Sequence, residues 1–71
     1  MTYLNKVPVG ISNTIKWIIG DENLRNFARR YGLEQGSRIR IVLFNKDQLI
    51  AEVGDNHRLG ISMDLASHIA V

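Results

Sequence analysis

The chain has 71 residues, of which 45% are hydrophobic and 23% are charged, and its formal net charge is +2. A chain of this length is expected to form a single domain, residues 1–71, around a dense core. The lack of cysteine excludes disulfides and thiolate metal sites and favours the cytoplasm, and no apolar run approaches the ~18 residues that membrane insertion requires.

An irregular segment is expected from Tyr3 to Gly10, because Pro8 has no backbone donor and Gly10 accommodates a positive φ. The apolar side chains of this segment are expected to close one end of the core; they are Leu4, Val7 and Val9.

A first long strand is predicted from Asn13 to Ile19, a stretch rich in β-branched and aromatic residues. Strict alternation places Ile15, Trp17 and Ile19 on one face. We therefore expect Trp17 to be an anchor of the core rather than a platform for a ligand.

A helix is predicted to begin after Asp21, a favourable N-cap, and to run to about Tyr31. Gly32 stands where a left-handed residue ends a helix, and Leu33 would supply the hydrophobic contact of that cap. The helix should carry an apolar stripe and a basic face. The stripe consists of Leu24, Phe27, Ala28 and Tyr31, and the basic face carries Arg25, Arg29 and Arg30.

Three antiparallel strands are predicted between Gly36 and Ile61, separated by turns at residues 45–47 and 54–56. Three-residue turns put all the apolar sets on one side of the sheet. The resulting pairs are Ile39 with Val53, Ile41 with Ala51, and Leu43 with Leu49. A two-residue loop at residues 46–47 is rejected, because it would set Ile41 opposite Glu52.

The same register places Glu52 between Arg40 and Arg58 on the outer face, where opposite charges help to define the pairing. After the third strand, a single 3₁₀-type turn is predicted over residues 62–67, capped by Ser62 or Asp64. A last short strand, residues 68–71, follows with Ile69 and Val71 inward.

These elements predict a mainly β fold: a small, SH3-like, partly open barrel of about five strands. One α-helix lies between strands 1 and 2, and a short 3₁₀ turn precedes the last strand. The terminal strand is expected to return beside the first, with the helix as a lid on one end.

No catalytic set and no metal centre can be assembled from the sequence. His57 and His68 are the only histidines, and no spacing brings carboxylate ligands to them. We therefore expect no enzyme activity and no cofactor, with His57 at the rim of the sheet.

Two surfaces are candidates for contact with a protein partner. The outer face of the three-stranded sheet is expected to gather the apolar side chains of Val42, Phe44 and Ile50. The alternative is that the first strand or the N-terminal segment covers them. The second surface is the helix face with Arg25 and Arg29, for which simple solvation is the alternative.

The ordered set of segments resembles the ferrous iron transport protein A (FeoA) family along nearly the whole chain. The segments that carry the resemblance are Leu4…Pro8-Val9-Gly10, Asp21–Arg25, Tyr31–Gly36, Arg38–Val42 and Leu59–Val71. The chain departs from the family in having Val9 between Pro8 and Gly10, and in a compact loop at residues 45–47.

The resemblance implies an SH3-like barrel in the bacterial cytoplasm and an accessory or regulatory role in ferrous iron uptake. The implied partner is the cytosolic region of the ferrous iron transporter membrane protein (FeoB). It also leaves open a weak or indirect association with ferrous iron or another divalent transition metal, and a homo-oligomer.

The alternative from another class is a small nucleic-acid-binding β-barrel. Basic side chains could follow phosphates while Phe44 or Trp17 stacks on bases; these basic residues are Arg38, Arg40, Arg58 and Lys46. The low net charge and the position of Glu52 argue against it, so no nucleic acid is expected as a partner.

Overall fold

The structure is a computed structural model that describes residues 1–55 and 57–71. Asn56, which the sequence places in the second turn, lies outside the described residues. The elements in chain order are η1 (Leu4–Lys6), β1 (Ser12–Thr14), β2 (Trp17–Ile18), α1 (Glu22–Arg29), β3 (Arg38–Phe44), β4 (Gln48–Val53), β5 (His57–Ser62), α2 (Met63–Ala66) and β6 (Ile69–Ala70).

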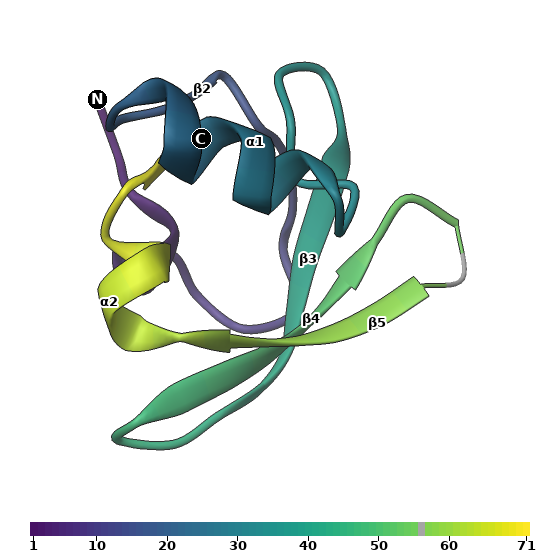
Figure 1. The fold of residues 1–71 in the computed structure, drawn as a ribbon. Coiled ribbons are helices and arrows are strands. Elements are labelled where there is room, and N and C mark those ends of the chain that lie inside the picture. Colours follow the sequence, from purple (N-terminus) through teal and green to yellow (C-terminus); the bar gives the residue numbers. More distant parts are fainter. Residues whose placement is uncertain (56) are drawn as a thin grey trace.

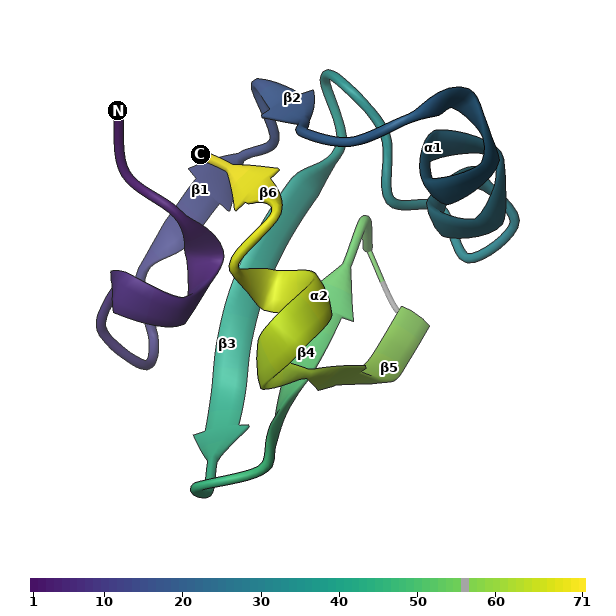
Figure 2. The ribbon, with the colours of Figure 1, turned by 60° about the vertical axis from the view of Figure 1, so that its left-hand side comes forward.

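The described strands form two antiparallel sheets rather than a closed barrel. One sheet has the order β1-β3-β4-β5, and the other pairs β2 with β6 (Figure 1). Figure 2 shows the C-terminal strand lying beside β2, where Trp17 pairs with Ala70 and Ile18 with Ile69. The predicted mainly β, partly open fold is confirmed, as is the return of the last strand to the first.

The core fills the space enclosed by the two sheets and closed by the helices. Its largest side chains with under 2% exposure are Leu4, Ile15, Leu33, Ile39, Ile41, Leu49, Ile61 and Ile69. These come from every part of the chain, so the N-terminal and C-terminal segments are integral to the fold. Leu4 is buried as predicted, whereas Val9 is 50% exposed and the prediction that it closes the core is wrong.

The first predicted strand is broken into β1 and β2. The chain changes partner between them: the Ile15 N–H donates to Ser37 at 2.8 Å, beside β3, and the Lys16 N–H donates to Ala70 of β6 at 2.7 Å. This step reverses the alternation, so that Ile15 and Ile18 are buried while Trp17 is 45% exposed. The prediction of one continuous strand with Trp17 inward is therefore wrong.

The three-stranded sheet has the predicted pairs Ile39–Val53 and Ile41–Ala51, but its register shifts between Ile41 and Leu43. Beyond the shift Leu43 pairs with Ile50 and Phe44 with Leu49, so the predicted Leu43–Leu49 pair is wrong. The shift is a β-bulge, in which two residues of one strand oppose one of the other.

The bulge preserves the predicted core pairs although the loop between β3 and β4 is one residue shorter than predicted. The Asn45 N–H donates to the Gln48 carbonyl at 3.0 Å, which leaves only residues 46 and 47 in the loop. The Asn45 side-chain oxygen accepts from the N–H groups of Asp47 and Gln48, at 3.0 and 2.9 Å, and stabilises this loop. The two-residue loop that was rejected from the sequence is present, because the extra residue at the bulge keeps Ile41 opposite Ala51.

Both ends of α1 follow the sequence signals. The Asp21 carboxylate accepts from the Leu24 N–H at 2.9 Å, which confirms the N-cap. The helix ends at Arg29 rather than at Tyr31, because the N–H of Tyr31 bonds three residues back, to Ala28, at 3.0 Å. Gly32 then takes a positive φ of 83°, and the Leu33 N–H returns to the Ala28 carbonyl at 3.1 Å.

The turn before the last strand is a four-residue α-helix, α2, rather than the predicted 3₁₀ turn. The Ser62 hydroxyl accepts from the Leu65 N–H at 3.1 Å, as the sequence suggested. Within the described part of the chain, no helix is long and apolar enough to cross a membrane.

Candidate contact surfaces

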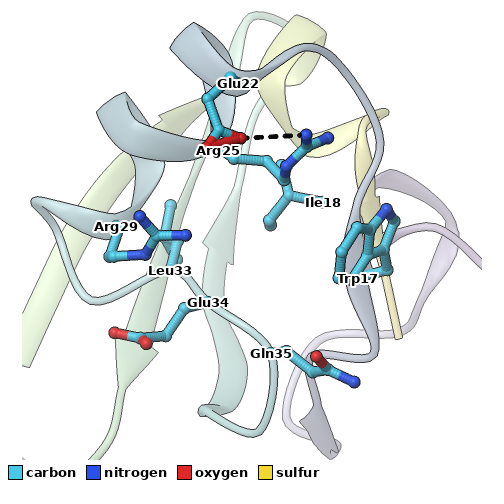
Figure 3. A pocket seen from close by; sticks show the side chains of 8 residues that line it. All are labelled: Trp17, Ile18, Glu22, Arg25, Arg29, Leu33, Glu34 and Gln35. Carbon is cyan, nitrogen blue, oxygen red and sulfur yellow. Dashed lines mark hydrogen bonds and ion pairs between the residues drawn. The ribbon is translucent and has the colours of Figure 1, made fainter.

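A pocket of about 410 Å³ lies between α1, β2 and the segment that leads into β3 (Figure 3). The residues that line it are Trp17, Ile18, Glu22, Arg25, Arg29, Leu33, Glu34 and Gln35. The structure therefore brings the two predicted arginines, Arg25 and Arg29, to one concave surface. We call it the arginine pocket.

Arg25 is held in place by several partners. Its guanidinium donates to the Gly20 carbonyl and, at 3.3 Å, to the Glu22 carboxylate, and it lies 5.4 Å from the centre of the Trp17 ring. A cation over a tryptophan face is a favourable arrangement. Among the described residues, the Arg29 guanidinium makes one hydrogen bond, of 2.8 Å to the Asn26 side chain, and is therefore less constrained. Arg29 therefore has more donors left for a ligand than Arg25.

Trp17 is a member of this pocket that sequence reasoning missed. Its position in an alternating stretch indicated burial, and only the change of partner strand after Ile15 turns it outward. No signal within the stretch itself marks that change.

The predicted apolar surface of the sheet is divided by the bulge. Because residues that pair across strands share a face, Val42 and Leu43 lie on the outer face with Ile50, and Phe44 lies on the other face with Leu49. Leu43 is 59% exposed and Phe44 is 39% exposed. The prediction that Val42, Phe44 and Ile50 share the outer face is therefore wrong for Phe44, and Leu43 takes its place.

Glu52 lies on the same outer face between two cations, as predicted. Its carboxylate is 3.0 Å from the Arg40 guanidinium and 3.7 Å from that of Arg58. The hydrogen bond from Arg40 is the main cause that lowers the pKa of Glu52 below its ordinary value, and Arg58 adds to it. The carboxylate compensates part of the positive charge that a nucleic-acid phosphate would meet on this face, so the face does not favour the nucleic-acid alternative.

A second concave surface, of about 220 Å³, lies between α1, β5 and α2. The residues that line it are Phe27, Tyr31, Leu33, Leu59, Gly60, Ile61 and Leu65. The rings of Phe27 and Tyr31 meet edge to face with centres 5.3 Å apart, yet remain 47% and 42% exposed. We call it the apolar groove. Sequence reasoning treated these two aromatics as part of a buried stripe and so missed the groove.

The histidines do not build a metal centre. His57 is exposed at the start of β5, opposite Val53, which confirms its predicted position at the rim. The Nδ1 of His68 is 2.8 Å from the Ile19 carbonyl, and because a carbonyl only accepts, Nδ1 carries the proton. Among the described residues, no three histidine, aspartate or glutamate side chains gather closely enough to hold an ion.

No family model and no curated protein sequence matches the chain. Several solved structures are similar to it, and two of them are crystal structures of FeoA proteins. One is described as the iron uptake regulatory protein FeoA; it is 25% identical, the match covers 96% of this chain and 91% of that one, and the TM-score is 0.88.

The other structure is FeoA of Stenotrophomonas maltophilia in complex with zinc, described as a prokaryotic SH3 domain protein and as a candidate activating factor for ferrous iron transport. It is 18% identical, the match covers 100% of this chain and 89% of that one, and the TM-score is 0.82. This similarity over nearly the whole chain confirms the resemblance to the ferrous iron transport protein A family.

Proposed function

We propose that this chain is a non-enzymatic, cytoplasmic accessory protein of ferrous iron uptake that acts by contact with the cytosolic region of the ferrous iron transporter, FeoB. The observation that carries the proposal is the match to FeoA over 96% of the chain at a TM-score of 0.88. The two similar proteins are described as a regulator of iron uptake and a candidate activator of ferrous iron transport, not as enzymes.

The surface of the molecule supports a binding role. Several large apolar side chains are exposed, among them Leu43 on the outer face, Phe44 at the end of β3, Phe27 on α1 and Tyr31 just after it. Exposed apolar side chains that gather at one place, as Phe27 and Tyr31 do, are typical of a contact surface. Arg29 and Trp17, which line the same pocket, add the residue types that dominate binding energy at protein interfaces.

In this proposal, metal binding is not the main activity of the protein. One similar protein was crystallised with zinc, yet the described residues of this chain do not fit a three-ligand site. We therefore expect divalent metal to associate weakly or through a partner, rather than to be a resident cofactor.

The test is a binding assay between this protein and the purified cytosolic region of the transporter, with and without guanine nucleotide. Four variants separate the surfaces: Arg29→Glu for the arginine pocket, Ile50→Glu and Leu43→Glu for the outer face, and Phe44→Glu for the end of β3. Arg29 is preferred to Arg25 because Arg25 also holds Gly20 and Trp17 in place. Lys46→Glu is the matched control for charge, because Lys46 is an exposed loop residue.

Circular dichroism must show that each variant is folded. Loss of binding by a folded variant at one surface, with Lys46→Glu unaffected, supports the proposal and identifies the surface. The proposal is refuted if the wild-type protein does not bind the cytosolic region of the transporter in any nucleotide state.

A further inference from the structure

The outer edge of β5 is open for pairing. In the part of the chain that the structure describes, β5 is the last strand of its sheet and has β4 on one side only. In an antiparallel pair, successive residues direct their N–H and C=O groups alternately toward the partner strand and away from it. The residues of β5 that face away from β4 are therefore available to another strand.

The direction of these groups follows from one hydrogen bond. The Met63 N–H donates to the Asp47 carbonyl at 3.1 Å, one step beyond the pair of Ser62 with Gln48. By alternation Ile61 and Leu59 also bond to β4, and Gly60 and Arg58 direct their N–H and C=O groups outward. The described residues place no other backbone partner on that side of Gly60.

The open edge adjoins the apolar groove. Gly60 is exposed and lines the groove together with Leu59 and Ile61, and Phe27 and Tyr31 form the opposite wall. In Figure 1, α1 and β5 lie on either side of this region, with α2 at one end. A strand added beside β5 would send alternate side chains into the groove, because residues that pair across strands share a face.

The charge of Arg58 indicates which residue type an added strand would carry opposite it. Arg58 lies on the outer face with its side chain 62% exposed, and its 3.7 Å contact with Glu52 is longer than the 3.0 Å contact of Arg40 with the same carboxylate. Donors of Arg58 therefore remain for an acidic residue directly opposite it on an added strand. On a strand added parallel to β5, the next residue would face the groove beside Leu59, and the one after it would pass over Gly60, which has no side chain.

We infer that the β5 edge and the apolar groove bind an extended segment of a protein partner by strand addition, with an acidic residue opposite Arg58 and alternating apolar residues in the groove. Main-chain hydrogen bonds supply affinity in this mode and the groove supplies specificity. The inference deepens the proposed function by stating the kind of segment that the partner offers.

A second copy of this chain is a poorer occupant. If two β5 edges paired, Leu59 and Ile61 of each copy would still face their own cores, and neither groove would be filled. A segment from a different molecule has no such constraint on its apolar residues.

The test uses a capped nonapeptide in which an aspartate is followed by valine, threonine and valine between glycine and serine flanks. A peptide with lysine in place of the aspartate tests the charge. A peptide with the second valine and the threonine exchanged tests the alternation. Because this test needs no transporter, its failure is distinguishable from failure of the proposed function.

Two substitutions at one position isolate the backbone contact. Gly60→Pro removes the outward N–H and leaves the bonds of Leu59 and Ile61 to β4, a place where an edge strand tolerates proline. Gly60→Ala keeps the N–H, and its Cβ would lie 3.7 Å from Ile50, an ordinary contact. We expect Gly60→Pro to weaken peptide binding at least tenfold in calorimetry and Gly60→Ala to change it less than twofold.

Amide exchange in the wild-type protein gives a result that does not depend on any variant. Slower exchange of the Arg58 and Gly60 amides on addition of the peptide supports the inference, even if Gly60→Pro fails to fold. The inference would be overturned if folded Gly60→Pro bound the peptide as tightly as wild type, or if the wild type did not bind it. It would also be overturned if these amides became protected at higher protein concentration without any peptide.

Discussion

The Arg40 guanidinium donates a hydrogen bond of 3.0 Å to the Glu52 carboxylate across the β3–β4 pair. Arg58 approaches the same carboxylate from β5 at 3.7 Å, so that one acid connects three strands. The pair was predicted from the register alone, and it lies in the part of the sheet where that register is correct.

The ion pair predicts how stability changes with pH. The pKa of Glu52 is lowered in the folded protein, mainly by Arg40. A lowered folded pKa stabilises the fold above the ordinary carboxyl pKa of about 4.3, and this contribution is lost as the pH falls through the folded value. We expect Glu52→Gln to lower the melting temperature at pH 7, and the difference from wild type to shrink as the pH is lowered toward 3. A difference that stays constant or grows on acidification would contradict this assignment.

Glu52→Lys tests the same site by charge reversal. It places three cations on adjacent strands and should lower the melting temperature more than Glu52→Gln does. Thermal unfolding at low and high salt is the measurement, because screening reduces repulsion between exposed charges. Unchanged stability in Glu52→Lys would count against the pairing of Glu52 with both arginines.

The bulge predicts which of two similar side chains matters. Ile41 is fully buried, so Ile41→Ala should lower the free energy of unfolding by about 2–5 kcal/mol. Leu43 is 59% exposed, so Leu43→Ala should change it by only about 0.5 kcal/mol or less. Urea unfolding measures both. Comparable losses in the two variants would show that Leu43 contributes to the core and that the bulge is wrongly placed.

Much of the fold followed from local signals. The N-caps at Asp21 and Ser62, the glycine that ends α1, and the pairs Ile39–Val53 and Ile41–Ala51 all depend on residues close in sequence or on one alternating face. Such signals act through short-range sterics and hydrogen bonds, which is why a sequence reveals them.

The candidate surfaces were predicted less well, because they depend on which segments distant in sequence pack against one another. A two-residue loop after Asn45 requires an extra residue in β3, whereas a three-residue loop does not. The alternation of apolar and polar residues is compatible with both arrangements and cannot distinguish them. Trp17 turns outward because the chain moves from one sheet to the other after Ile15. The apolar groove depends on how α1 is placed relative to β5 and α2, an arrangement that leaves Phe27 and Tyr31 partly exposed.

The contact between Arg25 and Trp17 predicts a spectroscopic effect. Trp17 is the only tryptophan and is 45% exposed, so its emission should be that of a partly hydrated indole that acrylamide can quench. Arg25→Ala should increase the quenching and lower the free energy of unfolding by about 0.5–1 kcal/mol. Arg29→Ala is the control, because the Arg29 side chain bonds to Asn26. Equal quenching in Arg25→Ala and wild type would argue against the stacked arrangement.

The end of α1 predicts a backbone effect. Gly32 has a φ of 83°, a conformation that costs residues with a Cβ about 1–2 kcal/mol. Gly32→Ala should therefore lower the free energy of unfolding by roughly that amount, although its Cβ would lie an ordinary 3.6 Å from Val53. Gly60→Ala has a similar contact distance without the positive φ and should be nearly neutral. If the two variants were equally stable, the cap would not require glycine.

Metal binding gives the last prediction. His57 is exposed, His68 uses Nδ1 for the Ile19 carbonyl, and the described residues bring no third ligand to either ring. Each histidine can therefore offer zinc one nitrogen in water, which is far short of the four-coordinate site that the ion prefers. Calorimetric titration with zinc or ferrous iron should show only weak binding, and His57→Ala should leave it nearly unchanged. A saturable site of one ion per chain that His57→Ala abolishes would instead mean that the ligands assemble on metal binding. Metal binding would then be a main part of the function.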